Sequence, residues 1–279
     1  MNLLEFSLVV YGVSALAGFL GSLTGLGGGV VITPALTLLL GVDLHYAMGA
    51  SLVSVIATSS GAAAAYVKEG FSNIRVGMFL EIATTVGAVA GAHLTAVVPG
   101  SALAVILGVV LLYSAWHSTQ AVSEHPVAHT DPLAVRLNLD GTYPAGAQGK
   151  VQYHVDRVKA GFSIMFGAGL ISGLLGIGSG ALKVIAMDQA MRIPFKVSTT
   201  TSNFMIGVTA AASAGIYLRH GYIEPGLAMP VMLGVLSGSI LGARQLIGAR
   251  TRVLRWIFAG VIGVLAIEMI HSGLSGGIK

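Results

Sequence analysis

The chain contains no cysteine and very little charge. Only 9% of its 279 residues are Asp, Glu, Lys or Arg, whereas 54% are hydrophobic and the mean hydropathy is +0.85. The absence of cysteine excludes disulfides, cysteine metal sites and thiol catalysis, and it leaves the redox compartment undetermined. So few charged residues exclude an ordinary soluble surface. The composition therefore predicts a membrane protein.

Motifs of common enzyme and nucleotide-binding classes are also lacking. The chain has no H-E-x-x-H, no paired intramembrane aspartates, no G-x-G-x-x-G followed by an acid and no G-K-[ST]. The formal net charge is only +4, and the basic residues lie at the ends of apolar segments, which favours positive-inside placement over a nucleic-acid surface. We therefore expect no enzyme, cofactor, metal site or nucleic-acid partner, although spacing alone does not exclude a serine–lysine or serine–histidine pair.

Apolar segments almost free of charge recur along the whole chain. They cover residues 8–23, 46–67, 82–98, 102–118, 160–182, 197–218, 226–243 and 257–267. Lipid-facing backbone must satisfy its own hydrogen bonds, so such segments favour helices about 20 residues long. The alternation of polar and apolar residues that marks a membrane barrel is not present. The predicted class is an all-α polytopic membrane protein.

Two glycine-rich runs divide the chain into two similar copies. Gly25-Leu26-Gly27-Gly28-Gly29 is followed 151 positions later by Gly176-Ile177-Gly178-Ser179-Gly180. The same offset, without a gap, pairs Gly18 with Gly169, Ser51 with Ser202, Tyr66 with Tyr217, Gly70 with Gly221, Gly87 with Gly238, and Gly91 with Gly242. A constant offset that also carries serine and tyrosine indicates duplication. We expect transmembrane repeats at 1–117 and 158–279, joined by a polar cytoplasmic connector at 118–157 that forms a flexible loop or a short hairpin.

Each copy has a glycine-broken first segment followed by three long helices, and loop charges predict how the copies are oriented. The loop at 192–196 is net positive, whereas its equivalent at 41–45 carries an acid. The loop before the last helix of each copy is uncharged at Pro99 in the first copy and carries arginines in the second. Corresponding loops then face opposite sides, which predicts an inverted repeat with an odd number of crossings per copy. Eight plain spans would instead give parallel repeats, so about 8 to 10 membrane segments are expected.

The glycine runs predict a binding site at the centre of the membrane. A helix that stops inside the bilayer frees backbone groups that only protein or a wet cavity can satisfy, and the next half-helix presents N–H donors and a partial positive charge. Two matched breaks therefore predict an anion site. Its expected residues are Gly25, Gly27, Gly28, Gly29, Gly176, Gly178, Ser179 and Gly180. Alternatively, the glycines only let helices pack closely.

Polar residues near the breaks extend this predicted site. Lys183 lies three residues past the second run, where its counterpart Ile32 is apolar, and we expect it either to contact the anion or to snorkel to the interface. The helix after each break opens with hydroxyls and an amide that suit an anion, or that bond to their own helix: Ser51, Thr201, Ser202 and Asn203. Glu81, His93 and Arg244 are candidate gating or proton-linked groups, or interfacial anchors.

The two glycine runs, the Ala50-Ser51 and Thr201-Ser202-Asn203 openings and the two-copy plan resemble the sulfite exporter TauE/SafE family, also called TSUP transporters. The resemblance covers the whole chain except the connector at 118–157, which is longer and more polar than the family's usual link. It implies export of small sulfur-containing anions, such as sulfite or organosulfonates, across the bacterial inner membrane. It also implies that the breaks and the Ser/Thr/Asn openings line the pathway. Ser179 stands where the first copy has Gly28, so the half-sites need not contribute equally.

The sequence thus predicts a secondary transporter that alternates access to a midplane anion site. Its partners are a small anion, the lipid bilayer and a coupling ion, either a proton or sodium. An anion channel of the same architecture is the alternative hypothesis, because hydroxyls and half-helix ends also suit a continuous pathway.

Overall fold

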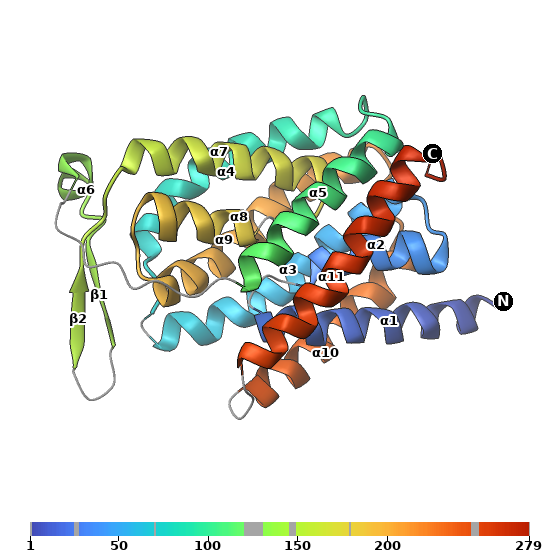
Figure 1. Ribbon diagram of the computed structural model, residues 1–279, viewed down its shortest axis with the longest axis horizontal. Helices are drawn as coiled ribbons and strands as arrows, with labels where there is room; N and C mark the ends of the chain where they lie inside the picture. The colour runs from blue at the N-terminus through green and yellow to red at the C-terminus, as the bar shows by residue number, and fades with distance from the viewer. Residues whose placement is uncertain are drawn as a thin grey trace.

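The computed structural model describes residues 2–24, 28–69, 71–119, 131–144, 149–178, 180–246 and 251–278. The first half contains α1 (Leu3–Thr24), α2 (Gly29–Leu40), α3 (Leu44–Glu69), α4 (Ile74–Leu94) and α5 (Gly100–Thr119). A small unit follows, made of α6 (Pro132–Arg136), β1 (Gly141–Pro144) and β2 (Lys150–Tyr153). The second half contains α7 (Val158–Leu175), α8 (Gly180–Ile185), its π-helical continuation η2 (Ala186–Ala190), α9 (Phe195–Arg219), α10 (Pro225–Leu246) and α11 (Thr251–Leu274). Figure 1 shows the long helices side by side, with the small unit at one end.

The outer surface and the helix lengths are those of a membrane protein. Within the described residues, α1, α4, α5 and α7 each hold at least 18 residues apolar enough to cross a membrane, and shorter apolar stretches occupy α2, α3, α10 and α11. Large apolar side chains point outward, including Trp116 at 60%, Trp256 at 63% and Val264 at 68% exposure. Such a surface is costly in water and favourable against lipid. The predicted class, an all-α multi-pass membrane protein, is confirmed.

Each glycine run ends one helix and is followed by a shorter one. Gly176 and Gly178 have φ of 65° and 73°, a left-handed conformation that residues with a Cβ rarely adopt. The Gly176 N–H closes α7 by donating to the Ser172 carbonyl at 2.9 Å. α2 has 12 residues, which at about 1.5 Å each cover only part of a core about 30 Å thick. In Figure 1, α2 runs from the centre toward the end that holds both termini, whereas α8 runs toward the end that holds the small unit.

The helices pair in a pattern that repeats at the offset of 151 found in the sequence. α1 packs along α10, and the corresponding α7 packs along α4. A Cβ on Gly18 would overlap the backbone of Val235, and a Cβ on Gly169 would overlap the backbone of Thr84, which is the equivalent contact in the other copy. Two further equivalent overlaps are Gly87 with Phe166 and Gly238 with Ala15. These glycines let backbones approach closely, as small residues do between membrane helices.

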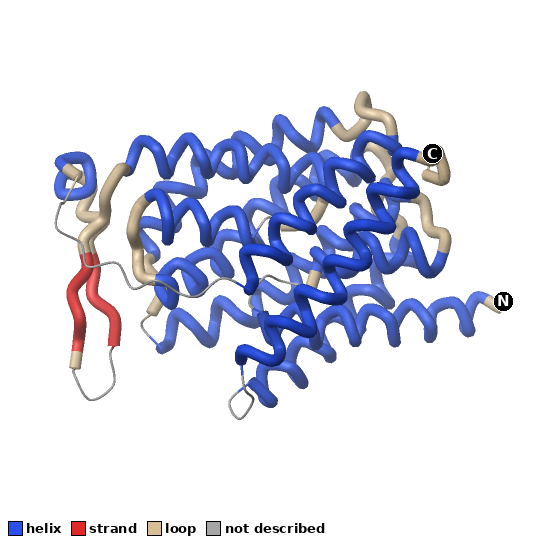
Figure 2. The backbone as a smooth tube through the Cα atoms, viewed as in Figure 1, coloured by secondary structure: helices blue, strands red, loops and turns tan. Residues whose placement is uncertain are grey.

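The described part of the connector is a short antiparallel hairpin with one helical turn beside it. β1 pairs with β2, and Figure 2 shows the two strands at one end of the helical body. Asp131 caps α6 by accepting from the Leu133 N–H at 2.8 Å, and its second oxygen accepts from the Val158 N–H at 2.9 Å. His154 pairs with Asp140 at 2.9 Å, whereas His125 and His129 lie outside the described residues. Of the two alternatives for the connector, the hairpin is the one present.

Asn73 joins this hairpin to the helices. Its Nδ2 donates to the Leu139 carbonyl at 2.8 Å and to the Tyr153 hydroxyl at 2.7 Å, and its Oδ1 accepts from the Val76 N–H, which caps α4. Its backbone N–H donates to Thr201 Oγ1 at 3.0 Å. Burial raises the pKa of Tyr153 to about 12, so the hydroxyl stays protonated at neutral pH. The connector is therefore attached to the start of both α4 and α9.

Replacing Gly169 with alanine should destabilise the protein, because the new Cβ overlaps Thr84 backbone that cannot rotate away. Overpacking of this kind costs about 1–3 kcal/mol. Gly167 is the matched control: it lies on the same helix, and a Cβ there meets nothing within 4 Å. Gly167→Ala should be neutral or stabilising by up to about 1 kcal/mol. Thermal unfolding in detergent measures both, and equal midpoints for the two variants would contradict close packing of α7 on α4.

Candidate functional site

The two helix breaks are held by the same hydrogen bond, made once in each copy. Ser51 Oγ on α3 donates to the carbonyl of Gly29, the first residue of α2, at 3.1 Å. Ser202 Oγ on α9 donates to the carbonyl of Gly180, the first residue of α8, at 3.2 Å. Both serines are fully buried. Each hydroxyl thus fixes where a half-helix begins, while its oxygen still has an acceptor site for a further donor.

The two breaks converge near the centre of the molecule. A Cβ on Gly29 would lie 2.8 Å from Ser51 Oγ and 3.6 Å from the Ile177 carbonyl oxygen of the other break. A Cβ on Gly178 would lie 3.0 Å from both Val55 and Ile206, two residues separated by the same offset of 151. The Val55 side chain is the nearest neighbour of the Gly29 Cβ position and also contacts that of Gly178, so it packs against both breaks. Gly28, Gly29, Gly176, Gly178 and Gly180 are all buried there, whereas Gly25, Gly27 and Ser179 lie outside the described residues.

The start of α2 has the features of an anion-binding helix end. Gly28 stands at the N-cap position and provides no side-chain cap. Its carbonyl accepts from the N–H groups of Val31 and Ile32, at 3.1 and 3.2 Å, so the helix is regular from its first turn. A helix start without a capping side chain leaves first-turn N–H donors for water or a ligand. The geometry therefore suits an anion, and the predicted substrate roles of these residues remain predictions.

The last turn of α7, before the second break, is held by a tyrosine whose role was not predicted from the sequence. The buried Tyr217 hydroxyl donates to the carbonyls of Gly173 and Leu174, at 3.0 and 3.1 Å, and lies 3.1 Å from Thr95 Oγ1. Thr95 in turn donates to the Leu174 carbonyl at 3.0 Å. These bonds satisfy carbonyls that the end of α7 leaves free. The offset of 151 that pairs Tyr217 with Tyr66 was a signal of this role. The side chain of Tyr66 lies outside the described part of the chain.

The polar run that opens α9 divides between two roles. Ser198 Oγ donates to the Ile193 carbonyl and Thr200 Oγ1 to the Lys196 carbonyl, so these two hydroxyls serve the local backbone. Thr201 accepts from Asn73, and Ser202 holds the break as described above. Asn203 is 8% exposed and follows directly on Ser202. The side chains of this run thus reach both Asn73, which holds the connector, and the second break.

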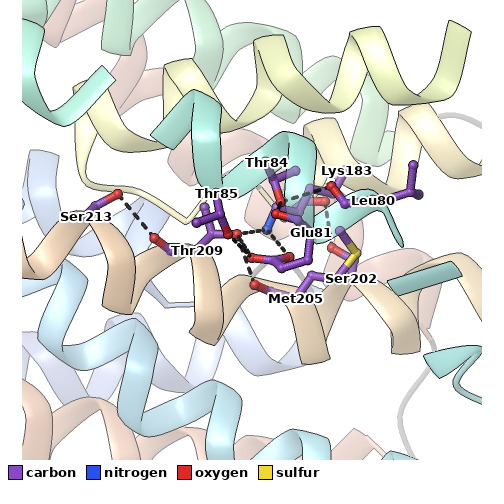
Figure 3. Close-up of polar contacts among 10 residues, drawn as sticks. Leu80, Glu81, Thr84, Thr85, Lys183, Ser202, Met205, Thr209 and Ser213 are labelled. Atoms are coloured by element: carbon purple, nitrogen blue, oxygen red, sulfur yellow. Dashed lines mark hydrogen bonds and ion pairs between the residues drawn. The ribbon is translucent and has the colours of Figure 1, made fainter. Parts of the chain in front are cut away.

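A buried ion pair lies beside the second break. Lys183 on α8 has no exposed surface, and its Nζ lies 3.7 Å from Oε2 of Glu81 on α4, whose side chain is 10% exposed. Lys183 also donates to Thr209 Oγ1 on α9, and Thr209 donates to Glu81 Oε1 at 2.6 Å. Thr85 adds a bond of 3.3 Å to the same oxygen. Figure 3 shows these groups pointing toward one another from three helices. Lys183 is therefore paired inside the protein and does not snorkel.

The sequence indicated both charges separately but not their pairing. They are 102 positions apart on helices with no recognisable common motif. One signal was available: the offset of 151 places Lys183 opposite Ile32 and Glu81 opposite Met232. Two opposite charges that both lack a counterpart, each inside an apolar segment, favour one another as partners.

The remaining candidates lie away from this pair. His93 is exposed at the end of α4, and its Nδ1 lies 2.9 Å from the Val89 carbonyl, one turn back on its own helix. That arrangement is typical of an interfacial anchor. Arg244 belongs to α10, and its side chain lies outside the described part of the structure. A proton-linked role for either residue remains a prediction.

A bundle of apolar helices with two broken segments meeting at its centre, beside buried charges, is typical of membrane transporters. Residues 10–269 match the family described as Sulfite exporter TauE/SafE, and the chain belongs to this family of membrane transporters. It is 27% identical over 96% of its length to the "Probable membrane transporter protein YunE" of Bacillus subtilis, covering 97% of that protein. It is 26% identical to YdhB of the same organism, covering 85% of this chain and 87% of YdhB. A "Probable membrane transporter protein" of Xylella fastidiosa is 25% identical, with 94% and 92% covered. No solved structure gives a significant match.

Breaking the ion pair from one side should destabilise the protein strongly. Glu81→Met leaves Lys183 buried without a counter-charge, and Lys183→Met does the same to Glu81, at a cost of about 3–5 kcal/mol each. The double variant replaces both charges with apolar side chains, so it should be more stable than the sum of the two losses predicts, by about 1–3 kcal/mol.

The pair of an exposed Asp43 and a half-buried His45, with oxygen and nitrogen 3.4 Å apart, is the control. Asp43→Asn should cost less than about 1 kcal/mol. Denaturation of the purified wild type, the two single variants and the double variant gives the unfolding free energies of this double-mutant cycle. Strictly additive losses at Glu81 and Lys183 would mean that the two charges do not interact.

Proposed function

We propose that this chain is a secondary transporter that exports small sulfur-containing anions, such as sulfite or organosulfonates, across the bacterial inner membrane. The observation that carries the proposal is the convergence of two helix breaks, with an uncapped helix start, next to the buried Lys183. The partial positive charge of the half-helices and the ammonium group both favour an anion. Ser51, Ser202 and Asn203 would then replace part of its water shell. The family description supports the sulfur chemistry.

The two copies are proposed to be inverted across the membrane. Their half-helices α2 and α8 run toward opposite ends of the molecule (Figure 1). If the pieces on either side of each break form a re-entrant hairpin, three crossings per copy remain. The β1–β2 hairpin of the connector and the loop between α10 and α11 then lie on the cytoplasmic side. An inverted repeat lets one copy rock against the other and expose the same site to either side in turn.

A carrier is favoured over a channel of the same architecture. Lys183 has no exposed surface, and its ammonium group is enclosed by Glu81 and Thr209. A channel needs a continuous wet path past its anion-binding groups, whereas a carrier needs closed states. With no nucleotide-binding motif in the sequence, an ion gradient or the gradient of the anion itself drives transport.

The proposal predicts that a sulfur anion stabilises the folded protein. Thermal unfolding in detergent is compared with sulfite, sulfate, thiosulfate, sulfoacetate, taurine, phosphate, bicarbonate and chloride at matched pH and ionic strength. An anion at 100 times its dissociation constant should stabilise by roughly 2.7 kcal/mol if it binds only the folded state. Lys183→Ala should bind the anion at least about tenfold more weakly and therefore show less stabilisation. Lys159 is an exposed lysine on α7, and Lys159→Ala should be stabilised as the wild type is. Flux from liposomes with counterflow then separates a carrier from a channel. A response to chloride or phosphate alone would refute the sulfur assignment.

Cysteine accessibility tests the inverted arrangement, and the native chain has no cysteine to interfere. Single cysteines at Thr142 in β1 and at Arg250 should react with a membrane-impermeant maleimide from the same side. A cysteine at Leu94, where α4 ends, should react from the other side. Opposite labelling of Thr142 and Arg250 would contradict the odd number of crossings per copy.

A further inference from the structure

We propose that Glu81 is the proton-binding group of this transporter and that an anion reaches Lys183 only when Glu81 takes up a proton. The inference rests on the proposed function, because it describes the same site. It identifies the ion that moves with the anion as a proton and assigns its binding to one carboxylate. Because the proton leaves with the anion, export is driven by the outward gradient of the anion and not by the inward proton gradient. Binding of one monovalent anion would then be accompanied by uptake of one proton.

The geometry makes Glu81 the internal counter-ion of Lys183. The ammonium group is enclosed by Glu81 and Thr209, and the carboxylate lies where an anion would have to bind. Thr209 Oγ1 accepts from Lys183 and donates to Glu81 Oε1, so a single hydroxyl orders both charges. Glu81 Oε2 is buried and makes no hydrogen bond among the described residues. That oxygen therefore has a free site for a proton.

Charge balance at a buried site links the anion to the proton. With Glu81 ionised, the pair is neutral, and a bound anion would leave a net charge of −1 in a region of low dielectric constant, which is costly. If the Glu81 carboxylate accepts a proton from solvent, the pair carries +1 and the anion restores neutrality. Release of the anion reverses both steps, and the proton returns to solvent. The site is thus neutral both empty and loaded.

The other ionisable groups near this pair do not replace Glu81 in that role. α4 packs against α7 and α9, and Lys183 comes from α8. The charged residues on α4, α7 and α9 in the described chain, apart from Glu81, are exposed and lie near helix ends: Arg75, His93, Lys159, Lys196 and Arg219. The buried Tyr217 is occupied by the end of α7, and the buried Asp188 lies in η2, while Lys183 forms its ion pair with Glu81.

The charge pair is confined to one half of a site that is otherwise duplicated. Thr209 has the equivalent Thr58, which bonds to the Ser54 carbonyl of its own helix at 3.1 Å. The counterparts of the charges are the apolar Ile32 and Met232. The equivalent positions of the repeat are thus occupied by apolar side chains, so the repeated pattern does not itself require a charge pair. Glu81 of the first half and Lys183 of the second depart from the repeat together, which a function in binding explains.

Anion affinity as a function of pH tests the inference in the full-length protein. Isothermal titration with methanesulfonate, an organosulfonate that carries a single negative charge throughout this range, is performed between pH 5.5 and 8.5 on the wild type and on Glu81→Gln, which mimics the protonated acid. Wild-type affinity should fall as pH rises, approaching tenfold per pH unit once Glu81 is ionised. Glu81→Gln should bind with no such fall. The ratio of the two affinities removes any titration of the anion itself, which affects both proteins equally.

Glu268→Gln is the matched control, because Glu268 is an exposed acid on α11, and this variant should keep the wild-type pH dependence. If Glu81→Gln does not fold, proton uptake by the wild type decides. Adding methanesulfonate to weakly buffered protein with a pH indicator should show uptake of one proton for each anion bound.

The outcomes separate this inference from the proposed function. Anion binding by the wild type with the same pH profile as Glu81→Gln, or without proton uptake, overturns the role of Glu81 and leaves the transporter assignment intact. Absence of binding and flux with every sulfur anion overturns the proposed function, and the inference with it.

Discussion

A helix that stops inside a bilayer must have its free backbone groups satisfied by the protein, and the arrangement at the centre of this chain follows from that constraint. The Gly180 and Gly29 carbonyls accept from Ser202 and Ser51. The carbonyls at the end of α7 accept from Tyr217 and Thr95. The free carbonyls at the end of α7 are thus matched by hydroxyl donors from neighbouring helices, whereas the start of α2 has no side-chain cap in the part of the chain that the structure describes. N–H groups at such a helix start favour an anion.

Close packing around the breaks requires small residues along the supporting helices. Gly18 and Gly238 let α1 approach α10, and Gly87 and Gly169 do the same for α4 and α7. Since the contacts are equivalent in the two copies, each break is supported by one helix of its own copy and one of the other. The pairs α1 with α10 and α4 with α7 are thus formed across the copies, and they pack on α3 and α9, which contact each other.

Most of the fold could be predicted from the sequence because it depends on local composition and on one repeated offset. Apolar length gives the helices, glycine gives the breaks, and the offset of 151 relates positions such as Ser51 and Ser202 that make equivalent bonds. The hairpin of the connector was one of two open alternatives, since its short strands carry no strong alternating pattern. The attachment of that hairpin through Asn73 could not be predicted, because a single polar residue in a loop does not indicate which of many donors and acceptors it will meet.

The site was predicted less completely, and the reason is instructive. The pattern that relates the two copies finds residues that they share, so it identified the glycines and serines but not the way Glu81 and Lys183 pair. A duplicated unit made only of shared features binds its ligand symmetrically and has no means of distinguishing a loaded site from an empty one by charge. One acid in the first copy, Glu81, and one base in the second, Lys183, each without a counterpart, would make the central site responsive to protons and anions together. The departure from symmetry is therefore where a coupling mechanism is expected, and the carboxylate within 3.7 Å of the buried ammonium is that departure.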